Sequence, residues 1–499
     1  MRSSAACCCL VLLLAVVAVV ARAHPLAAPP VLVAAEEEKG ETWRRIEVEE
    51  VEAQLQDLTF MPRDTSDKPV FVHLAFAGAP TRMAVSWWTQ GLYVTNTSTE
   101  AHFLTLLFSG SLYVVKTEAS VVKYGLQPGK YTSAAKGNSR TYKESIGYTH
   151  DVVLTDLVPG STYYYICGDG SSDVSKWSAE YNFTAAPVRG PPATAPTRVA
   201  MYGDMGTWYS SDTIKRVAEL IHNGSLDFVY HVGDMSYAND RISYWYQSVW
   251  DEWFGMMTPV MSRVPYMVCP GNHEQQSGFP TLSYSTKFNL YNYRFRMPFQ
   301  ESNSTGQNMW FSFDYKNVHF ISISTETDFP GCPFADTFGN QLAWLEADLQ
   351  KANNNRAQVP WIIVVGHRPM YSSVDSIYVQ WYVDGLRKAV EKLFHTYQVD
   401  LYVCGHVHSY ERTWPLLDGK KTASSYDHPP SLSQIVTGAA GCIEGLNDGW
   451  ASSPAAWSAH RYGKGEGYGV LEVFNSTTLQ WSFFRSADNG LEDFFVLRK

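Results

Sequence analysis

Short glycine-containing motifs carry the side chains in this sequence that could do chemistry. The last of them, VCGHVHSYE at residues 403–411, places His406 and His408 two residues apart directly after an apolar run. Four earlier motifs are built in a similar way, namely GDMG, GDMSY, GNHE and VVGHRP, which contain Asp204, Asp234, Tyr237, Asn272, His273 and His367. Any one of these motifs alone is most simply a turn, a helix cap or a core histidine. Together they supply enough oxygen and nitrogen donors for two metal ions that share a bridging carboxylate.

The elements around these motifs alternate between strand and helix, which predicts an α/β domain. Apolar strand-like runs precede the motifs, and helices are expected over residues 212–221, 339–352 and 379–397, with Asp212 capping the first. Ligands bind open α/β sheets at the carboxyl ends of the strands, so the motifs should meet at one edge. From Ser433 the sequence becomes β-rich, with a hairpin expected at VFNSTTLQW.

The residues before this region have the composition of a separate β domain. Leu157, Pro159 and Tyr163 have the spacing of a tyrosine corner, in which a phenol hydroxyl ties a sandwich strand to nearby backbone. Residues 67–187 therefore resemble a fibronectin type III-like domain. A proline-rich linker at 188–197 leads to the α/β domain at 198–499, which includes the β-rich C-terminal part. The predicted fold class is multidomain, an all-β sandwich followed by an α/β domain.

The N-terminus predicts export. Arg2 precedes an apolar run that ends at a small-x-small cleavage site, so residues 1–23 are expected to be a signal peptide, followed by an acidic arm or propeptide at 24–66. The run is short for a bilayer crossing, so no stable membrane insertion is expected. The protein should be secreted or extracellular, or vacuolar or lysosomal through the secretory pathway. Sequons for glycosylation stand at Asn96, Asn182, Asn223, Asn303 and Asn475.

The length, net charge and cysteine content of the chain limit its domain organisation, its binding partners and its disulfides. A chain of 499 residues is long for one core, and a net charge of −10 makes nucleic acid a poor partner. The cysteines that would remain after export are Cys167, Cys269, Cys332, Cys404 and Cys442. Because their number is odd, at least one stays free or pairs outside the chain. Cys332 and Cys442 are the expected pair, while Cys269 and Cys404 are expected as buried thiols.

The order of the five motifs resembles that of the calcineurin-like metallophosphoesterases. Most members of that superfamily carry a histidine two residues after the first aspartate, where this sequence has Gly206. Here Tyr237 stands three residues after Asp234 instead, and this exchange is the mark of the purple acid phosphatases. The resemblance runs from about Lys68 over nearly all of the following chain, and includes the fibronectin-like domain of the large plant and animal form.

This resemblance implies a secreted acid phosphatase that hydrolyses phosphate monoesters with a metal-bound hydroxide at a dinuclear Fe(III)–M(II) centre. It assigns Asp204, Tyr237 and His408 to the ferric ion, Asp234 to the bridge, and Asn272, His367 and His406 to a divalent zinc, manganese or iron ion. A phenolate is a hard anionic donor that suits trivalent iron. The implied partners are small-molecule phosphate esters, and a homodimer is possible.

The resemblance also implies roles around the metals. His273 should be catalytic and, with Asn272, should bind the phosphate, although His273 could instead orient a ligand. Glu274, Glu411 and Arg412 are expected as supporting residues. Many plant relatives carry further substrate-contacting histidines after the residue equivalent to His367, and this sequence has none there. Tyr371, Asp375 or Tyr378 could replace them, and Arg368 could bind phosphate or form a structural salt bridge.

The sequence leaves three alternative functions open. The metal site could serve a phosphodiesterase or a phytase, with substrate choice made by residues 279–299, which include Lys287, Arg294 and Arg296; the same segment could simply pack against the β domain. A non-catalytic cell-surface binding module would use the fibronectin-like domain. A cytosolic-type dimanganese protein phosphatase is disfavoured by Gly206 and by the expected signal peptide.

Overall fold

The structure, a computed structural model, divides into two units, Met1–Asp64 and Thr65–Lys499. It describes residues 31–37, 40–46, 68–90, 119–142, 147–188, 195–240, 246–275, 288–333, 337–375 and 377–499. In the first unit, strands β1 (Val31–Glu37) and β2 (Gly40–Ile46) pair as an antiparallel hairpin within the expected acidic arm. The expected signal peptide and the sequon at Asn96 lie outside the described residues.

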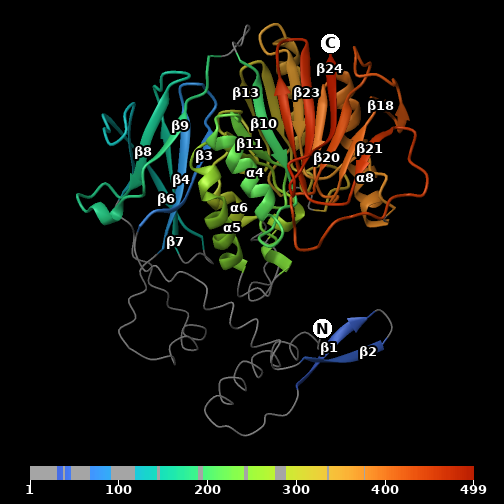
Figure 1. The fold of residues 1–499 in the computed structure, drawn as a ribbon, viewed down its shortest axis with the longest axis horizontal. Coiled ribbons are helices and arrows are strands. Elements are labelled where there is room, and N and C mark those ends of the chain that lie inside the picture. The colour runs from blue at the N-terminus through green and yellow to red at the C-terminus, as the bar shows by residue number, and fades with distance from the viewer. Residues whose placement is uncertain are drawn as a thin grey trace. The chain divides into compact units, whose positions relative to one another are not determined.

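The second unit begins with the predicted all-β domain. Its antiparallel strands follow the order β3-β4-β7-β6-β5-β8-β9. They form the blue to blue-green part at the left of the main body in Figure 1. They are β3 (Val70–Phe76), β4 (Met83–Gln90), β5 (Ser120–Gly125), β6 (Ser133–Arg140), β7 (Gly147–Leu154), β8 (Thr162–Gly168) and β9 (Tyr181–Thr184). The tyrosine corner is confirmed, because the backbone N–H of Val158 donates to the Tyr163 hydroxyl at 2.9 Å.

Two mixed sheets form the α/β part, as the alternation of elements predicted. The first has the order β12-β11-β10-β22-β23-β24, made of β10 (Thr197–Tyr202), β11 (Phe228–His231), β12 (Tyr266–Val268), β22 (Gly467–Val473), β23 (Thr478–Arg485) and β24 (Leu491–Arg498). The second has the order β13-β14-β15-β16-β20-β17-β21, made of β13 (Phe311–Tyr315), β14 (Val318–Ser322), β15 (Trp361–Val365), β16 (Leu401–Cys404), β17 (Tyr410–Thr413), β20 (Ser433–Thr437) and β21 (Ser458–Tyr462). A short hairpin, β18 (Leu416–Leu417) and β19 (Lys420–Lys421), lies outside both.

Parallel pairing aligns the strand ends that precede the motifs. Strands β10, β11 and β12 are parallel to one another in the first sheet, and β14, β15, β16 and β20 are parallel in the second. The expected hairpin at VFNSTTLQW is the turn between β22 and β23. C-terminal strands therefore complete both sheets instead of forming a domain of their own.

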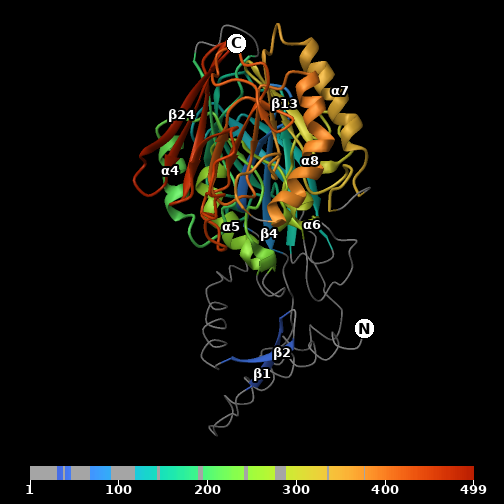
Figure 2. The same cartoon turned by 90° about the vertical axis from the view of Figure 1, so that its right-hand side faces the viewer.

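Helices cover the outer faces of the two sheets. The described α-helices are α4 (Ser211–His222), α5 (Tyr246–Met261), α6 (Asn289–Arg294), α7 (Gln341–Asn354) and α8 (Ile377–Thr396), and the 3-10 turns are η2 (Val174–Lys176), η3 (Ala238–Asp240), η5 (Asn272–Glu274) and η7 (Gln307–Met309). Helices α7 and α8 lie on one side of the molecule and α4 on the other (Figure 2). On α7, Leu345, Leu349 and Ala352 recur at helical spacing and are buried against the second sheet.

One helix boundary differs from the prediction. Asp212 does not cap α4, because the helix begins at Ser211, with Ser210 in the cap position, and Asp212 lies in the first turn. A carboxylate there still interacts favourably with the positive end of the helix dipole, so a sequence pattern cannot separate the two positions. Within the described part of the chain, no helix combines the length and apolar character needed to cross a bilayer.

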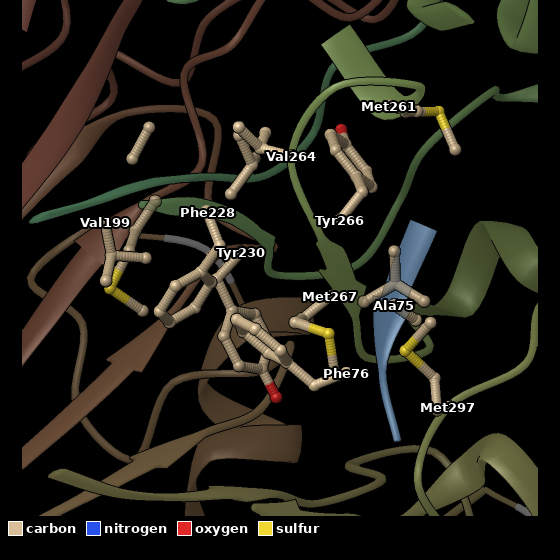
Figure 3. Close-up of a cluster of buried hydrophobic side chains, with 14 of the residues drawn as sticks. Ala75, Phe76, Val199, Phe228, Tyr230, Met261, Val264, Tyr266, Met267 and Met297 are labelled. Carbon is tan, nitrogen blue, oxygen red and sulfur yellow. The ribbon is translucent and has the colours of Figure 1, made fainter. Parts of the chain in front are cut away.

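The β domain and the α/β part share one hydrophobic core. Phe76 of β3 packs edge-on against Phe228 of β11, with ring centroids 5.1 Å apart, and also lies 5.1 Å from the ring of Tyr315. Figure 3 shows Ala75 and Phe76 among side chains of β10, β11 and β12. The hydroxyl of Tyr165 adds a buried hydrogen bond to the carbonyl of Ser262, at 2.7 Å. The junction is therefore packed like a protein interior.

The arginines of segment 279–299 belong to this junction. Arg294 is buried, pairs with Asp251 at 2.8 Å, and lies 5.1 Å from the ring of Trp88. Arg296 is also buried and makes a bidentate pair with Glu301. The sequence suggests either substrate choice or packing against the β domain for this segment, and Arg294 and Arg296 serve packing. Lys287 lies outside the described residues.

The expected disulfide between Cys332 and Cys442 is not formed. Cys442 is a free thiol whose Sγ lies 3.2 Å from Nδ1 of His408, and Sγ of Cys332 accepts a hydrogen bond from the backbone N–H of Phe329. Both cysteines lie in glycine-flanked loop sequences, but the fold places the loop of Cys442 at the candidate site, beside His408. The expectation of buried thiols at Cys269 and Cys404 is confirmed.

We expect Phe76→Ala to lower the free energy of unfolding by about 3 to 5 kcal/mol, because it opens a cavity in the shared core. Denaturant unfolding followed by tryptophan fluorescence measures the change. Val174→Ala, at a valine with 86% of its surface exposed, is the control and should change the stability by less than about 0.5 kcal/mol. Equal stability of the two variants would show that the junction contributes little.

Candidate metal centre

The loops after β10 and β11 run side by side and hold the first two motifs together. Backbone N–H groups of Asp204, Met205 and Gly206 donate to the carbonyls of Gly233, Asp234 and Met235, at 3.2, 3.1 and 2.8 Å. This ladder extends the parallel pairing beyond the strand ends. It fixes Asp204 and Asp234 next to each other, and both side chains are buried.

Backbone strain marks the same loops. Asp204, Asp234, Tyr237 and His406 all have positive φ, at 59°, 53°, 57° and 67°. Residues other than glycine adopt this left-handed conformation at a cost of roughly 1 to 3 kcal/mol each, and such residues cluster at functional sites. Four of the predicted ligands are therefore aimed by backbone conformations that the surrounding structure must enforce.

Glycines in the motifs make room for the ligand side chains. A Cβ atom on Gly271 would lie 2.2 Å from Oδ1 of Asp234, and one on Gly405 would lie 2.3 Å from Oδ2 of Asp204. Neither side chain can retreat, because Asp204 and Asp234 are themselves held by backbone hydrogen bonds. In the GNHE and GHVH motifs, the close approach of the backbone to the carboxylates therefore requires glycine.

Three predicted ligands form a first group. The hydroxyl of Tyr237 lies 3.3 Å from Oδ1 of Asp204 and 3.1 Å from Nε2 of His408, and the latter two atoms are 3.4 Å apart. The three side chains come from the loops after β10, β11 and β16. Their donor atoms form a triangle of the kind that a single cation could hold.

The remaining ligands gather around Asp234. Nε2 of His367 lies 2.9 Å from Oδ2 of Asp234 and 3.2 Å from Oδ1 of Asn272. Ligand atoms of Asp234, His367 and His406 all lie within 4.8 Å of one another. The structure therefore brings all seven predicted ligands together, in two groups connected by the Asp204 and Asp234 loops.

Backbone carbonyls orient two of the imidazoles. Nδ1 of His367 donates to the carbonyl of Val232, and Nδ1 of His408 donates to that of Gly445, each at 2.9 Å. Because a carbonyl only accepts, each ring presents its Nε2 to the centre, an arrangement that proteins use to position metal-binding histidines. His406 differs, since its Nε2 accepts a hydrogen bond from Nη1 of Arg368 at 2.8 Å.

The charges at the centre perturb one another strongly. Burial alone would lower the pKa of His367, but Asp234, Asp204 and Glu326 outweigh it and raise the pKa to about 9. Burial opposes ionisation of Asp234, yet His367 and His273 hold the pKa of its carboxyl well below the usual range. Burial, with the carboxylates of Asp204 and Asp234, raises the pKa of Tyr237. Strongly perturbed groups in one buried cluster are typical of functional sites.

The donor set fits metal ions better than it fits an internal hydrogen-bond network. Oδ2 of Asp234 is buried and accepts no well-formed hydrogen bond from the described residues, although Nε2 of His367 is 2.9 Å away. Buried polar atoms without partners are rare and call for an explanation. A cation that binds this oxygen and the imidazoles beside it would satisfy all of them, as carboxylate and imidazole ligands do in zinc and iron sites.

His273 faces this centre without joining either group. Its backbone N–H donates to Oδ1 of Asp234 at 2.8 Å, so it helps to fix that carboxylate. Nδ1 of its ring contacts the oxygens of Asn239 at 2.7 Å and Asp240 at 3.0 Å, which makes this nitrogen the donor. Burial would lower the pKa of His273, but Asp234, Asp240 and Glu444 raise it to about 10.

The supporting residues predicted from sequence divide into two kinds. Glu274 accepts hydrogen bonds from the backbone N–H groups of Asp234, Met235 and Gly271, at 2.8, 2.8 and 2.7 Å, so it holds two motifs together. Glu411 instead binds Ser373 and Ser458, and Arg412 pairs with Asp493. Supporting roles for Glu411 and Arg412 at the centre are therefore wrong.

The contacts of the residues that follow His367 decide two further expectations, on Tyr371 and on Arg368. Tyr371 does not replace the absent histidines, because its hydroxyl donates to Glu391 and accepts from the backbone of Gly419. The side chain of Tyr378 lies outside the described residues, and Asp375 is exposed. Arg368 forms the structural salt bridge, bidentate with buried Glu326 at 2.7 and 2.9 Å.

Sequence reasoning missed Glu444, whose carboxylate approaches both His273 and His408 to 3.7 Å. It follows β20, which is parallel to β16 in the second sheet, so its loop emerges at the edge that carries the GHVH motif. The signal was present in the sequence, because the glycine-rich stretch GAAGCIEG directly follows the strand sequence SQIVT.

Comparison with known families accounts for this arrangement. Residues 69–185 match the model of the purple acid phosphatase N-terminal domain, residues 197–410 that of the calcineurin-like phosphoesterases, and residues 432–494 that of iron/zinc purple acid phosphatase-like protein C. Probable purple acid phosphatase 20 of Arabidopsis thaliana is 33% identical over 433 residues, which cover 85% of this chain and 86% of that protein. The chain belongs to the purple acid phosphatase family.

Relatives outside plants match over a similar length. Acid phosphatase type 7 of Homo sapiens is 33% identical over 454 residues, or 87% of this chain and 92% of that protein. A purple acid phosphatase from yellow lupin (Lupinus luteus) seeds shares the fold, with a TM-score of 0.70 and 24% identity over 87% of this chain and 74% of that one. By family the protein is an acid phosphatase, an enzyme that hydrolyses phosphoric monoesters, with candidate histidine and aspartate metal-binding groups. The non-catalytic alternative is thereby set aside.

We expect Glu274→Gln to weaken metal binding by about 10- to 100-fold, because an amide offers one acceptor oxygen where three backbone donors now converge on a carboxylate. Metal content after dialysis against graded chelator measures this loss. Glu411→Gln is the matched control, since Glu411 is equally buried and hydrogen-bonded but touches no predicted ligand. It should lower stability and leave metal affinity unchanged; a similar loss of metal in both variants would contradict a positioning role for Glu274.

Proposed function

We propose that this purple acid phosphatase hydrolyses phosphate monoesters at a pair of metal ions, one ferric and one divalent zinc, manganese or iron ion. In this proposal Asp204, Tyr237 and His408 hold the ferric ion, Asp234 bridges, and Asn272, His367 and His406 hold the divalent ion. The single observation that carries it is the meeting of these seven side chains in two adjacent groups, only one of which contains a phenol. An anionic phenolate in one group favours a trivalent ion there.

The bound ions would supply Lewis-acid stabilisation of the phosphate and an activated water as nucleophile. The chain itself supplies orientation. Two imidazoles anchored on backbone carbonyls and two carboxylates fixed by backbone N–H groups cannot turn away when a substrate arrives. This is the preorganisation that electrostatic catalysis requires.

His273 has the geometry of a phosphate-binding and proton-donating group in this proposal. Its Nδ1 is engaged by Asn239 and Asp240, which turns Nε2 toward the centre, 3.9 Å from Oδ2 of Asp234. A donor hydrogen at Nε2 would stabilise charge on the phosphate or on the departing oxygen. Asn272, one residue earlier, would bind metal and phosphate together.

We also propose that the protein travels through the secretory pathway and is glycosylated. The signal-like residues 1–23 support this, and the sequon residues Asn223, Asn303 and Asn475 are exposed, while Asn182 is half-buried. N-terminal sequencing of protein recovered from the medium of expressing cells tests the proposal. An N-terminus that still begins at Met1 would contradict it.

Asp234→Ala and His406→Ala are each expected to abolish metal loading and phosphatase activity together, because each removes a donor from the group around the bridge. Metal analysis and turnover of p-nitrophenyl phosphate measure the two losses. Asp173→Ala, at an exposed aspartate of the β domain, should leave both unchanged. Full turnover by either site variant would contradict the proposed centre.

Tyr237→Phe is expected to remove a visible absorption band, since tyrosinate-to-iron charge transfer requires the phenolate oxygen. The spectrum is recorded on protein whose iron content has been determined. Tyr209→Phe, at an exposed tyrosine nearby in the sequence, should keep the band. Iron-containing wild-type protein that is colourless in its ferric form would refute the assignment of Tyr237.

A further inference from the structure

Glu444 is a partly exposed acidic side chain beside the candidate metal centre. It lies in the loop after β20, and 46% of its side-chain surface is exposed. Oε1 lies 3.7 Å from Nε2 of His273, and Oε2 lies 3.7 Å from Nε2 of His408. One carboxylate therefore spans a proposed phosphate-binding residue and a proposed metal ligand while remaining accessible to solvent.

The loop that carries Glu444 is rigidly attached to the centre. The backbone N–H of Tyr209 donates to the carbonyl of Gly441, and that of Asn447 donates to the carbonyl of His408 at 2.8 Å. The carbonyl of Gly445 in turn anchors Nδ1 of His408. Because residues on both sides of Glu444 bind the motif loops, its carboxylate is held beside the candidate metal centre.

Nothing described nearby neutralises this charge except the two histidines. Within the described residues, the ion-pair partners of Glu444 are His273 and His408, and no lysine or arginine pairs with it. A second carboxylate, that of Asp240, lies 3.0 Å from Nδ1 of His273 and has a quarter of its side-chain surface exposed. The described surroundings of the site thus present negative charge beside the place where a phosphate would bind.

We propose that Glu444 is a specificity-determining residue, which selects phosphate monoesters whose alcohol carries no further negative charge and discriminates against polyphosphorylated esters. The inference rests on the proposed function. Two metal ions and His273 offer positive charge for one phosphate group. Any additional phosphate on the same alcohol would approach Glu444, and the described residues supply no lysine or arginine that pairs with Glu444 there, whereas a hydroxyl or ammonium group could donate a hydrogen bond to it.

Two charges about 4 Å apart near a protein surface interact strongly enough to change affinity by at least about tenfold. The effect of Glu444 should therefore appear as a change in preference between substrates. A purely structural role would instead change the turnover of all substrates by a common factor. Salt screens exposed charges, so the effect should be largest at low ionic strength.

The test compares the metal-loaded full chain with Glu444→Gln and Glu444→Asp. Burial raises the pKa of Glu444, so the comparison is made at about pH 6.5, about two units above the usual pKa of a glutamate. The ratio of kcat/KM for inositol hexakisphosphate to that for phosphocholine is measured at low salt. We expect Glu444→Gln to raise this ratio by about tenfold or more. Glu444→Asp keeps the charge and should stay within about threefold of wild type, as should the control Glu346→Gln, which removes an exposed carboxylate on α7.

Calorimetry supplies a readout that does not depend on turnover. Glu444→Gln should bind inositol hexasulfate, a polyanion without phosphate esters, more tightly than wild type does. Its affinity for orthophosphate should also rise, but the increase in log affinity should be less than half of the increase for inositol hexasulfate. An unchanged substrate ratio, or an equal gain for both anions, would overturn the inference. Metal-loaded wild type that fails to hydrolyse p-nitrophenyl phosphate would instead overturn the proposed function, and the calorimetric comparison would still decide the role of Glu444.

Discussion

The concentration of buried charge between two sheets is the constraint on which the rest of this structure depends. Asp204 and Asp234 are removed from water, and carboxylates in such a position need partners that return the lost solvation. Imidazoles and backbone N–H groups provide part of it, and cations are suited to provide the rest. Several features hold these charges in place. They are the positive φ angles, the glycines that leave no room for a Cβ, and the three backbone N–H groups that donate hydrogen bonds to Glu274.

Parallel strands explain how such a cluster can be assembled from distant parts of the chain. Each motif follows a strand that runs parallel to its neighbours, β10, β11 and β12 in the first sheet and β15 and β16 in the second, so the loops at the carboxyl ends of these strands lie together. Hydrogen bonds between the loops after β10 and β11 then fix the positions of Asp204 and Asp234 relative to each other. The fold thus defines the position of each ligand, and the local backbone defines its direction.

Much of this could be predicted from sequence, because ligand motifs combine residue type with a local turn that needs glycine. The seven predicted ligands and the alternation of strand and helix meet as expected. Contacts between loops could not be predicted in the same way. The glycine-rich stretch after β20 marks Glu444 as a strand-end residue, but its contacts with His273 and His408 depend on loops that are neighbours only in the folded protein. The same holds for the pairing of Arg368 with Glu326 and for the position of Cys442 beside His408. Local spacing carries no information on such neighbours, so it predicts neither the free thiol of Cys442 nor which of Tyr371, Asp375 and Tyr378 lies near the centre.

The mixed first sheet has a consequence for how the protein is made. Strand β10, which leads into the first motif, lies between β11 and β22, and the ion pair of Arg198 with Glu472 across that pairing joins residues 274 positions apart. Non-local pairing of this kind slows folding, since a long loop must close before the contact forms. During synthesis, β10 therefore leaves the ribosome long before its antiparallel neighbour exists. The nascent chain must keep that apolar strand edge from aggregating until β22 has been synthesised.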